Sequence, residues 1–265
     1  LYENWGDEFY NTCEPVCQYV PPAGPFQQTI KWTQPNISRR HPTMIGDIDG
    51  DCVPDVVTMD DFSNIVVLNS ADGTLKYSYA ANPGSVYSQM AIGDVDSDSL
   101  MEIFVNSQSG GNRFLRIDFN TTTATLDLTW QSSTTIADAR YSAYLADFDY
   151  DGTPEVYTGN QIFDSQTGLE LVNGGIGNNT AWYPLGSSNF MTSVPFAADV
   201  LNDGACASCQ GLELVAGNQV YSVEIVSYSN PGLNSMSVVR EAPGLYDGAT
   251  VITDFDRDGD LDAIV

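Results

Sequence analysis

One acidic phrase recurs five times along this chain, at intervals of about fifty residues, and it constrains the fold more than any other feature. The copies begin at Asp47, Asp94, Asp147, Asp199 and Asp254. A period of this length is typical of repeat architectures, in which each unit buries its apolar face against its neighbours. Each copy follows a short apolar stretch ending in a small residue and precedes a β-rich stretch, as in Met44-Ile45-Gly46 and Val56-Val57-Thr58. The pattern predicts strand, acidic turn, strand.

Two further strands fit between successive copies. In the first unit, Ile65–Leu68 and Leu75–Tyr79 flank a turn containing Asp72-Gly73, which is a strong hairpin signal. In the third unit, Gln161–Phe163 and Leu169–Val172 repeat this form. Four short strands per unit predict an all-β fold, a β-propeller of four-stranded blades. A β-sandwich with decorated turns is the alternative, although it does not require a constant long period.

The repeats divide the chain in two. Residues 1–40 are rich in proline, contain Cys13 and Cys17, and lack the acidic phrase, so we expect a lead segment followed by a repeat region over residues 41–265. The chain stops at Val265, directly after the fifth phrase, before the outer strands of that unit. We therefore expect part of a longer protein whose complete ring has about seven blades.

The charge of the chain restricts its partners. The 265 residues carry a formal net charge of −26, and most of the acid lies in the five phrases. Such a surface repels nucleic acid and anionic lipid, so neither is an expected partner. No apolar run approaches the length of a membrane span, so direct membrane insertion is not expected either.

The cysteines indicate an oxidising compartment. Cys13 with Cys17 and Cys206 with Cys209 form two close pairs, and Cys52 is left over. This spacing suits two local disulfides in a secreted or cell-surface protein, with reduced buried thiols as the alternative. The chain starts at Leu1 rather than Met, which a removed leader or a trimmed sequence would explain.

Catalysis has little support. His41 is the only histidine, so His-dependent nucleophilic schemes and a zinc site from the cysteines both lack partners. We predict no catalytic residues and no cofactor besides metal.

The acidic phrase has the chemistry of a calcium loop. Numbered from its first residue, four copies carry aspartate at positions 1, 3 and 5 and an acid at position 9. The predicted side-chain ligands are Asp47, Asp49, Asp51 and Asp55; Asp94, Asp96, Asp98 and Glu102; Asp147, Asp149, Asp151 and Glu155; and Asp254, Asp256, Asp258 and Asp262. The backbone carbonyls at position 7 complete the set, from Val53, Leu100, Thr153 and Asp260. Ca²⁺ takes six to eight oxygen ligands of mixed kind, which a curling loop of this spacing supplies.

Two details refine this prediction. Position 6 is glycine in three copies, where a tight turn favours positive φ, whereas Cys52 and Ser99 stand there in the first two, so we expect those loops to be strained or to turn differently. An EF-hand would carry its closing acid at position 12 between helices, so this is not an EF-hand. The alternative, that Asp and Gly only make solvated turns, predicts scattered acids rather than one spacing kept four times.

The fourth copy departs from the pattern. Leu201 stands at position 3, and Cys206–Gly211 is inserted before Glu213. Asp199 and Asp203 remain as candidate ligands, and whether this copy holds metal stays open.

The motif D-x-D-x-D-G-x-x-[DE], set between an apolar strand end and an apolar strand, resembles the FG-GAP repeat of integrin α-subunit propellers and of many bacterial secreted proteins (VCBS/integrin-α-like). The resemblance covers residues 42–265 and implies a β-propeller with Ca²⁺ in hairpin loops on one face. The Phe-Gly and Gly-Ala-Pro sequences after which the repeat is named are mostly absent, and Val215-Ala216-Gly217 is a remnant of them. Their absence favours the broader bacterial group.

The leading hypothesis is a secreted or cell-surface binding and adhesion module, stabilised by several structural Ca²⁺ ions. Its partners would be an extracellular protein or glycan, or parts of its own larger chain or assembly. One alternative is a polysaccharide-active lyase or hydrolase built on a calcium propeller. A second is an architectural part of a large secreted adhesin.

Overall fold

The structure, a computed structural model, describes residues 29–38, 41–81, 89–107, 111–136, 142–174, 194–201, 211–242 and 250–264. These residues form an all-β fold in which the one helix is the short 3-10 turn η1 (Pro231–Leu233). No helix in the described ranges is long and apolar enough to cross a membrane.

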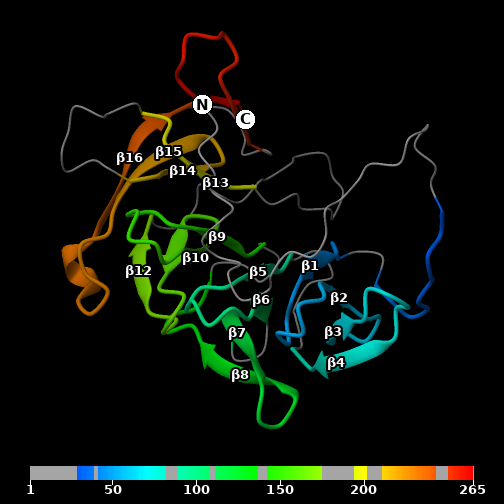
Figure 1. The fold of residues 1–265 in the computed structure, drawn as a ribbon. Helices are drawn as coiled ribbons and strands as arrows, with labels where there is room; N and C mark the ends of the chain where they lie inside the picture. Colours follow the sequence, from blue (N-terminus) through cyan, green and yellow to red (C-terminus); the bar gives the residue numbers. More distant parts are fainter. Residues whose placement is uncertain are drawn as a thin grey trace.

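The strands form five antiparallel sheets in chain order (Figure 1). The first sheet contains β1 (Met44–Gly46), β2 (Asp55–Met59), β3 (Ile65–Leu68) and β4 (Leu75–Tyr79). The second contains β5 (Ala91–Gly93), β6 (Glu102–Ser107), β7 (Arg113–Asn120) and β8 (Thr125–Gln131). The third contains β9 (Tyr144–Ala146), β10 (Glu155–Thr158), β11 (Gln161–Phe163) and β12 (Glu170–Asn173). The fourth contains β13 (Phe196–Ala198), β14 (Glu213–Ala216), β15 (Gln219–Glu224) and β16 (Ser235–Glu241). The fifth pairs β17 (Val251–Thr253) with β18 (Asp262–Ile264).

Each four-stranded sheet is a meander in which every strand pairs with the next one along the chain. The predicted strands Ile65–Leu68, Leu75–Tyr79 and Gln161–Phe163 are confirmed to the residue, and the prediction of an all-β fold is confirmed. The second strands β6, β10 and β14 are buried along their whole length, and β6 and β10 have a neighbouring sheet packed on each face. This accounts for their unbroken apolar character.

The cores lie between consecutive sheets. One core joins the first two sheets through residues such as Val57 and Ile117, the next joins the second and third, and another joins the third and fourth through Tyr157 and Leu214. The first strands also lie side by side, with contacts of β1 to β5, β5 to β9 and β13 to β17. The sheets therefore follow one another like blades around a common side, although the described residues do not form a closed ring (Figure 1).

Tryptophan side chains connect hairpin turns to the preceding part of the chain. Trp130 at the end of β8 donates its indole N–H to the Ser165 carbonyl at 2.9 Å, within the turn between β11 and β12. Trp32 makes the same contact with the Ser70 carbonyl in the turn between β3 and β4, also at 2.9 Å. Trp32, in residues 29–38, thus contacts the β3–β4 turn of the first sheet in the same way that Trp130 contacts the β11–β12 turn of the third sheet.

Both indole rings lie against a glycine with positive φ, Gly73 beneath Trp32 and Gly168 beneath Trp130. A Cβ on Gly168 would stand 2.6 Å from Cε3 of Trp130, and its φ is 71°. Glycine is required here for two reasons, the backbone conformation and the closeness of the ring.

Replacing Gly168 by alanine should lower the free energy of unfolding by about 2–4 kcal/mol, because left-handed strain and overpacking add. Gly111→Ala is the matched control, since its φ is 95° but the nearest atom to its Cβ is 3.9 Å away. That variant should lose only about 1 kcal/mol. Urea denaturation of both variants measures the difference, and equal losses would show that the Trp130 contact contributes nothing.

The disulfide prediction falls on residues of which the structure describes only Cys52. Cys13, Cys17, Cys206 and Cys209 lie outside the described residues, and their two predicted local pairs stay predictions.

Candidate metal centres

All five acidic phrases occupy the same place in their sheets, the turn between the first and second strand. We name them loop 1 (47–55), loop 2 (94–102), loop 3 (147–155), loop 4 (199–213) and loop 5 (254–262). In every sheet the closing acid is the first residue of the second strand and pairs with the last residue of the first, as Gly46 does with Asp55 and Ala146 with Glu155. The strand register therefore fixes where the closing carboxylate stands.

Loops 1, 2, 3 and 5 share one backbone conformation. Position 6 has positive φ in all four, at Cys52 (63°), Ser99 (73°), Gly152 (93°) and Gly259 (101°). Of the two alternatives expected for Cys52 and Ser99, strain is confirmed, because both are non-glycine residues with positive φ, whereas a different turn is not found. Position 4 also has positive φ in these loops, at Gly50, Ser97, Tyr150 and Arg257. The residue types at this position did not predict that conformation.

Backbone N–H groups hold the carboxylates in place in each of these four loops. The N–H of position 6 donates to the position 1 carboxylate, at 2.8 Å for Cys52 and 2.9 Å for Gly152. The N–H of position 2 donates to the closing acid, at 2.8 Å from Phe148 to Glu155. Because the same donors are satisfied at the same positions, the carboxylates at positions 1 and 9 are held in the same places in all four loops, while Asp96 and Asp256 at position 3 stay exposed to solvent.

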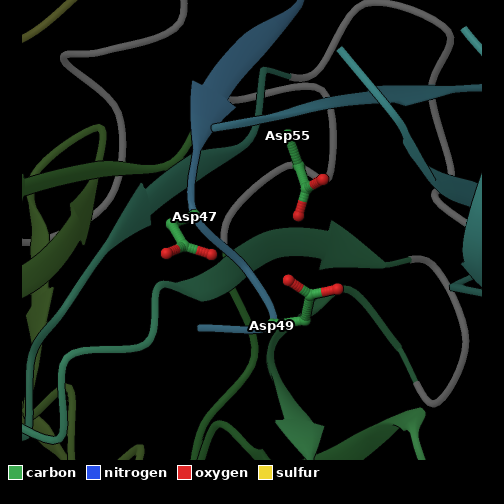
Figure 2. Close-up of side chains that lie close together, drawn as sticks. All are labelled: Asp47, Asp49 and Asp55. Atoms are coloured by element: carbon green, nitrogen blue, oxygen red, sulfur yellow. The ribbon is translucent and has the colours of Figure 1, made fainter. Parts of the chain in front are cut away.

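The result is four clusters of three carboxylates from positions 1, 3 and 9 that could hold a metal ion. They are Asp47, Asp49 and Asp55; Asp94, Asp96 and Glu102; Asp147, Asp149 and Glu155; and Asp254, Asp256 and Asp262. One oxygen from each member lies within 4.8 Å of the others in every cluster, and Figure 2 shows the first, with its three side chains turned toward one another.

Position 5 stands apart from these clusters. Asp51, Asp98, Asp151 and Asp258 each accept the N–H of position 7 through Oδ1, at 2.7–3.0 Å. The carboxylate at position 5 thus folds the end of the loop, and the predicted ligand role of the position 7 carbonyls stays a prediction.

Loop 4 keeps part of this geometry. Glu213 accepts the N–H of Val200, at position 2, at 3.0 Å, as the closing acids of the other loops do. Asp199 begins the loop, whereas Asp203 lies outside the described residues. Glu213 was not among the predicted ligands, because an insertion displaces it in sequence, although its place at the head of a β-rich stretch was a usable signal.

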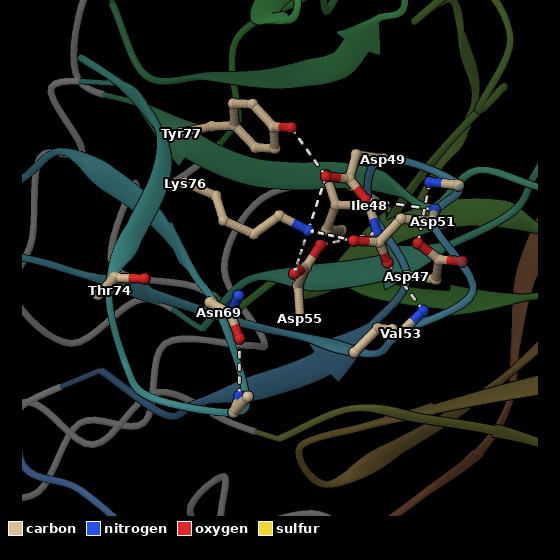
Figure 3. A network of polar contacts seen from close by, with 12 residues as sticks. Asp47, Ile48, Asp49, Asp51, Val53, Asp55, Asn69, Thr74, Lys76 and Tyr77 are labelled. Atoms are coloured by element: carbon tan, nitrogen blue, oxygen red, sulfur yellow. Dashed lines mark hydrogen bonds and ion pairs between the residues drawn. The ribbon is translucent and has the colours of Figure 1, made fainter.

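Four side chains that the sequence did not single out reach into the loops, and one of them is Tyr77, which donates its hydroxyl to Asp49. Lys76 on β4 places its ammonium among Asp49, Asp51 and Asp55 of loop 1 (Figure 3). Arg116 on β7 lies 2.5 Å from Asp96 and 3.9 Å from Glu102 in loop 2. Tyr228, which follows β15 of the next sheet, donates its hydroxyl to Glu155 of loop 3 at 2.5 Å.

The environment of each loop alters the pKa values of its acids. Burial raises the pKa of Glu102 and of Glu155 to about 8, and the backbone hydrogen bonds that each accepts, with the Arg116 charge or the Tyr228 hydroxyl, offset this only in part. At Asp49 burial also acts to raise the pKa, but hydrogen bonds from Lys76 and Tyr77 outweigh it and lower the pKa overall. Loop 1 is therefore compensated in part by Lys76, although burial still raises the pKa of Asp55, whereas loop 3 crowds carboxylates with no ion-paired cation among the described residues.

In buffer containing a chelator, the free energy of unfolding should fall as the pH rises from about 4.5 to about 8. Over this window the unfolded chain ionises Glu102 and Glu155 while the folded chain retains their protons, so rising pH favours the unfolded state. Urea titrations at several pH values measure the slope. The double variant Glu102→Gln/Glu155→Gln should lose much of it, and an unchanged slope would contradict this assignment.

The comparisons with known proteins agree with this arrangement. The FG-GAP-like repeat family matches residues 47–105 and 94–158, a span that holds loops 1, 2 and 3. No curated protein matches the chain in sequence.

Among solved structures, the crystal structure of the V. cholerae biofilm matrix protein Bap1 shares the fold, with a TM-score of 0.60 and 16% identity over 88% of this chain and 37% of that one. The rhamnogalacturonan lyase YesW matches with a TM-score of 0.36 and 15% identity, over 68% of this chain and 44% of that one. The chain spans less than half the length of either protein. The repeated loops, their shared strand register and the two family matches identify residues 47–158 as FG-GAP-like repeats.

Proposed function

We propose that this chain is a calcium-stabilised β-propeller module that acts outside the cell in binding or adhesion, with a protein or glycan as its partner. The observation that carries the proposal is the recurrence of one three-carboxylate cluster at the same turn of four sheets. The blade-like succession of sheets, with their first strands side by side, supports the propeller. Residues 41–265 would form this part, and residues 1–40 would be a lead segment.

The donor set suits a hard divalent cation. All the converging atoms are carboxylate oxygens, the ligands that Ca²⁺ prefers. In loop 2, Oδ1 of Asp94 is buried and has no hydrogen-bond partner among the described residues, a costly arrangement that a bound cation would relieve. Loop 3 has no ion pair with a described basic side chain.

The residues that would hold calcium are the position 1, 3 and 9 acids of loops 2, 3 and 5, with loop 4 as a partial set from Asp199, Asp203 and Glu213. Bound calcium would supply positive charge that lets these carboxylates stay ionised at close range. Its role would be structural, in fixing the turns that join the first two strands of each sheet.

The partner class follows from charge and from the fold. A net charge of −26 disfavours nucleic acid and anionic membranes, and bound calcium would reduce the repulsion of acidic glycans. The shared fold with a biofilm matrix protein supports an extracellular location and an adhesive role.

Two measurements on the full chain test the proposal. Calcium counted by equilibrium dialysis and elemental analysis should fall by one ion in Asp149→Asn and by one in Asp256→Asn, and absence of bound calcium at millimolar concentration would overturn the metal assignment. Glycan and extracellular-protein arrays probed with and without chelator should show calcium-dependent binding. Release of oligosaccharides from a polysaccharide panel would instead support an enzyme.

A further inference from the structure

Loop 1 contains a cation of the chain's own. Nζ of Lys76 lies 2.6 Å from Asp49, 2.8 Å from Asp55 and 3.0 Å from Asp51 (Figure 3). An ammonium group has three N–H donors, and here each has a carboxylate acceptor. The Lys76 side chain is 15% exposed and that of Asp55 is 1% exposed, so solvent screens their contact weakly, whereas Asp51 is 48% exposed.

The ammonium and a metal ion exclude each other. Calcium would need carboxylate oxygens of Asp49 and Asp55 at about 2.3–2.6 Å, and Nζ already lies 2.6 and 2.8 Å from one oxygen of each. Two cations cannot lie in contact with the same pair of carboxylates in this small loop without severe repulsion.

The remaining oxygens of the loop 1 cluster are also satisfied. Asp47 accepts N–H groups from Gly50 and Cys52, and Asp49 accepts the Tyr77 hydroxyl at 2.8 Å as well as Lys76. Oδ2 of Asp55 accepts the N–H of Ile48 at 3.4 Å. No carboxylate of this cluster is left with a buried oxygen that lacks a donor.

The other loops differ in this respect. In loop 2 the guanidinium of Arg116 is shared between Asp96 and Asp118 and stays 3.9 Å from Glu102, so it leaves Oδ1 of Asp94 buried and without a partner. In loop 3 the side chain that reaches in from outside the loop is Tyr228, whose hydroxyl carries no charge. In loop 5 the described hydrogen bonds to Asp254, Asp256 and Asp262 come from backbone N–H groups.

We propose that Lys76 is the resident cation of loop 1, standing where the other loops would take calcium, and that it prevents this loop from loading a divalent ion. The inference builds on the proposed function, in which loops 2, 3 and 5 bind calcium. It means that the first sheet keeps its loop ordered when calcium is scarce, because a covalently attached cation does not dissociate.

Counting bound calcium in variants of the full chain tests this. Asp49→Asn should leave the number of ions unchanged, since loop 1 holds none, whereas Asp149→Asn in loop 3 should lower it by one. Lys76→Met should raise the number by one, and Lys31→Met, which removes an exposed lysine that contacts only the Ser70 carbonyl among described atoms, should not. A loss of one ion in Asp49→Asn, or no gain in Lys76→Met, overturns the inference.

Terbium luminescence locates the new ion. Tyr77 contacts Asp49 and can sensitise a lanthanide bound in loop 1. Lys76→Met should therefore gain terbium emission that Lys76→Met/Tyr77→Phe loses, while Tyr77→Phe alone should leave the native signal unchanged. Failure of the proposed function is distinguishable, because then the native chain and Asp149→Asn would both bind no calcium, while the gain in Lys76→Met would still decide the role of Lys76.

Discussion

Replacing Phe148 by alanine should lower the free energy of unfolding by about 3–5 kcal/mol, the cost of removing a fully buried aromatic side chain. Phe148 stands at position 2 of loop 3, is 1% exposed and packs edge-on against Tyr157 at a centroid distance of 5.3 Å. It lies in the core between the third and fourth sheets, and its carbonyl accepts the N–H of Leu212 beside β14. The substitution therefore opens a cavity where two sheets meet.

The chain offers a matched control for this prediction. Phe255 occupies position 2 of loop 5 but is 74% exposed, so Phe255→Ala should change stability by less than about 1 kcal/mol. Urea denaturation of both variants in saturating calcium measures the two costs. Equal losses at the two positions would show that the burial of Phe148 between sheets does not determine stability.

Removing calcium should lower the melting temperature by about 10 °C or more. A site held at a thousand times its Kd stabilises the folded chain by about 4 kcal/mol, and 1 kcal/mol corresponds to about 2–4 °C for a chain of this size. The unpartnered oxygen of Asp94 and the crowded carboxylates of loop 3 are the groups that would lose compensation.

Calorimetry with calcium and with excess chelator measures this shift. The quadruple variant Asp96→Asn/Asp149→Asn/Asp199→Asn/Asp256→Asn should melt at the same temperature in both buffers, because one ligand is removed from each of loops 2, 3, 4 and 5. If the native chain melted identically with and without chelator, the acids would be holding their turns by backbone hydrogen bonds alone.

The sequence predicted the elements of this fold well where a local rule applies. Asp72-Gly73 marks a hairpin whose two strands, Ile65–Leu68 and Leu75–Tyr79, appear with the predicted bounds. The alternate spacing of acids likewise predicted the convergence of positions 1, 3 and 9, because that convergence depends only on loop conformation.

Contacts that depend on register or on a neighbouring unit could not be predicted in this way. Lys76 reaches Asp49 because of the way β3 and β4 pair. The register shifts between Val67 and Leu68, and residue 76 lies at this irregularity, beside loop 1. Tyr228 comes from the following sheet, 79 residues from Asp149. Neither residue type nor spacing signals these approaches, since they arise from packing.

The backbone strain at positions 4 and 6 shows that residue type alone does not predict the conformation of these loops. Glycine at position 6 suggested a left-handed turn, yet Cys52 and Ser99 adopt it as well, because the N–H of that residue must reach the position 1 carboxylate. Hydrogen bonding within the loop thus overrides residue preference, at a cost of about 1–2 kcal/mol for each non-glycine residue.

One hydrogen bond, from position 2 to the closing acid, gives the loops a directional role. The acceptor is the first residue of the second strand of its own sheet. The donor is Ile48, Val95 or Phe148, whose side chain packs in the apolar core shared with the next sheet. An ion bound at one turn, as proposed above, would therefore act mainly on the neighbouring sheet nearer the C-terminus. Unfolding should spread along such a molecule as in a one-dimensional cooperative array, with each turn controlling the attachment of the next unit.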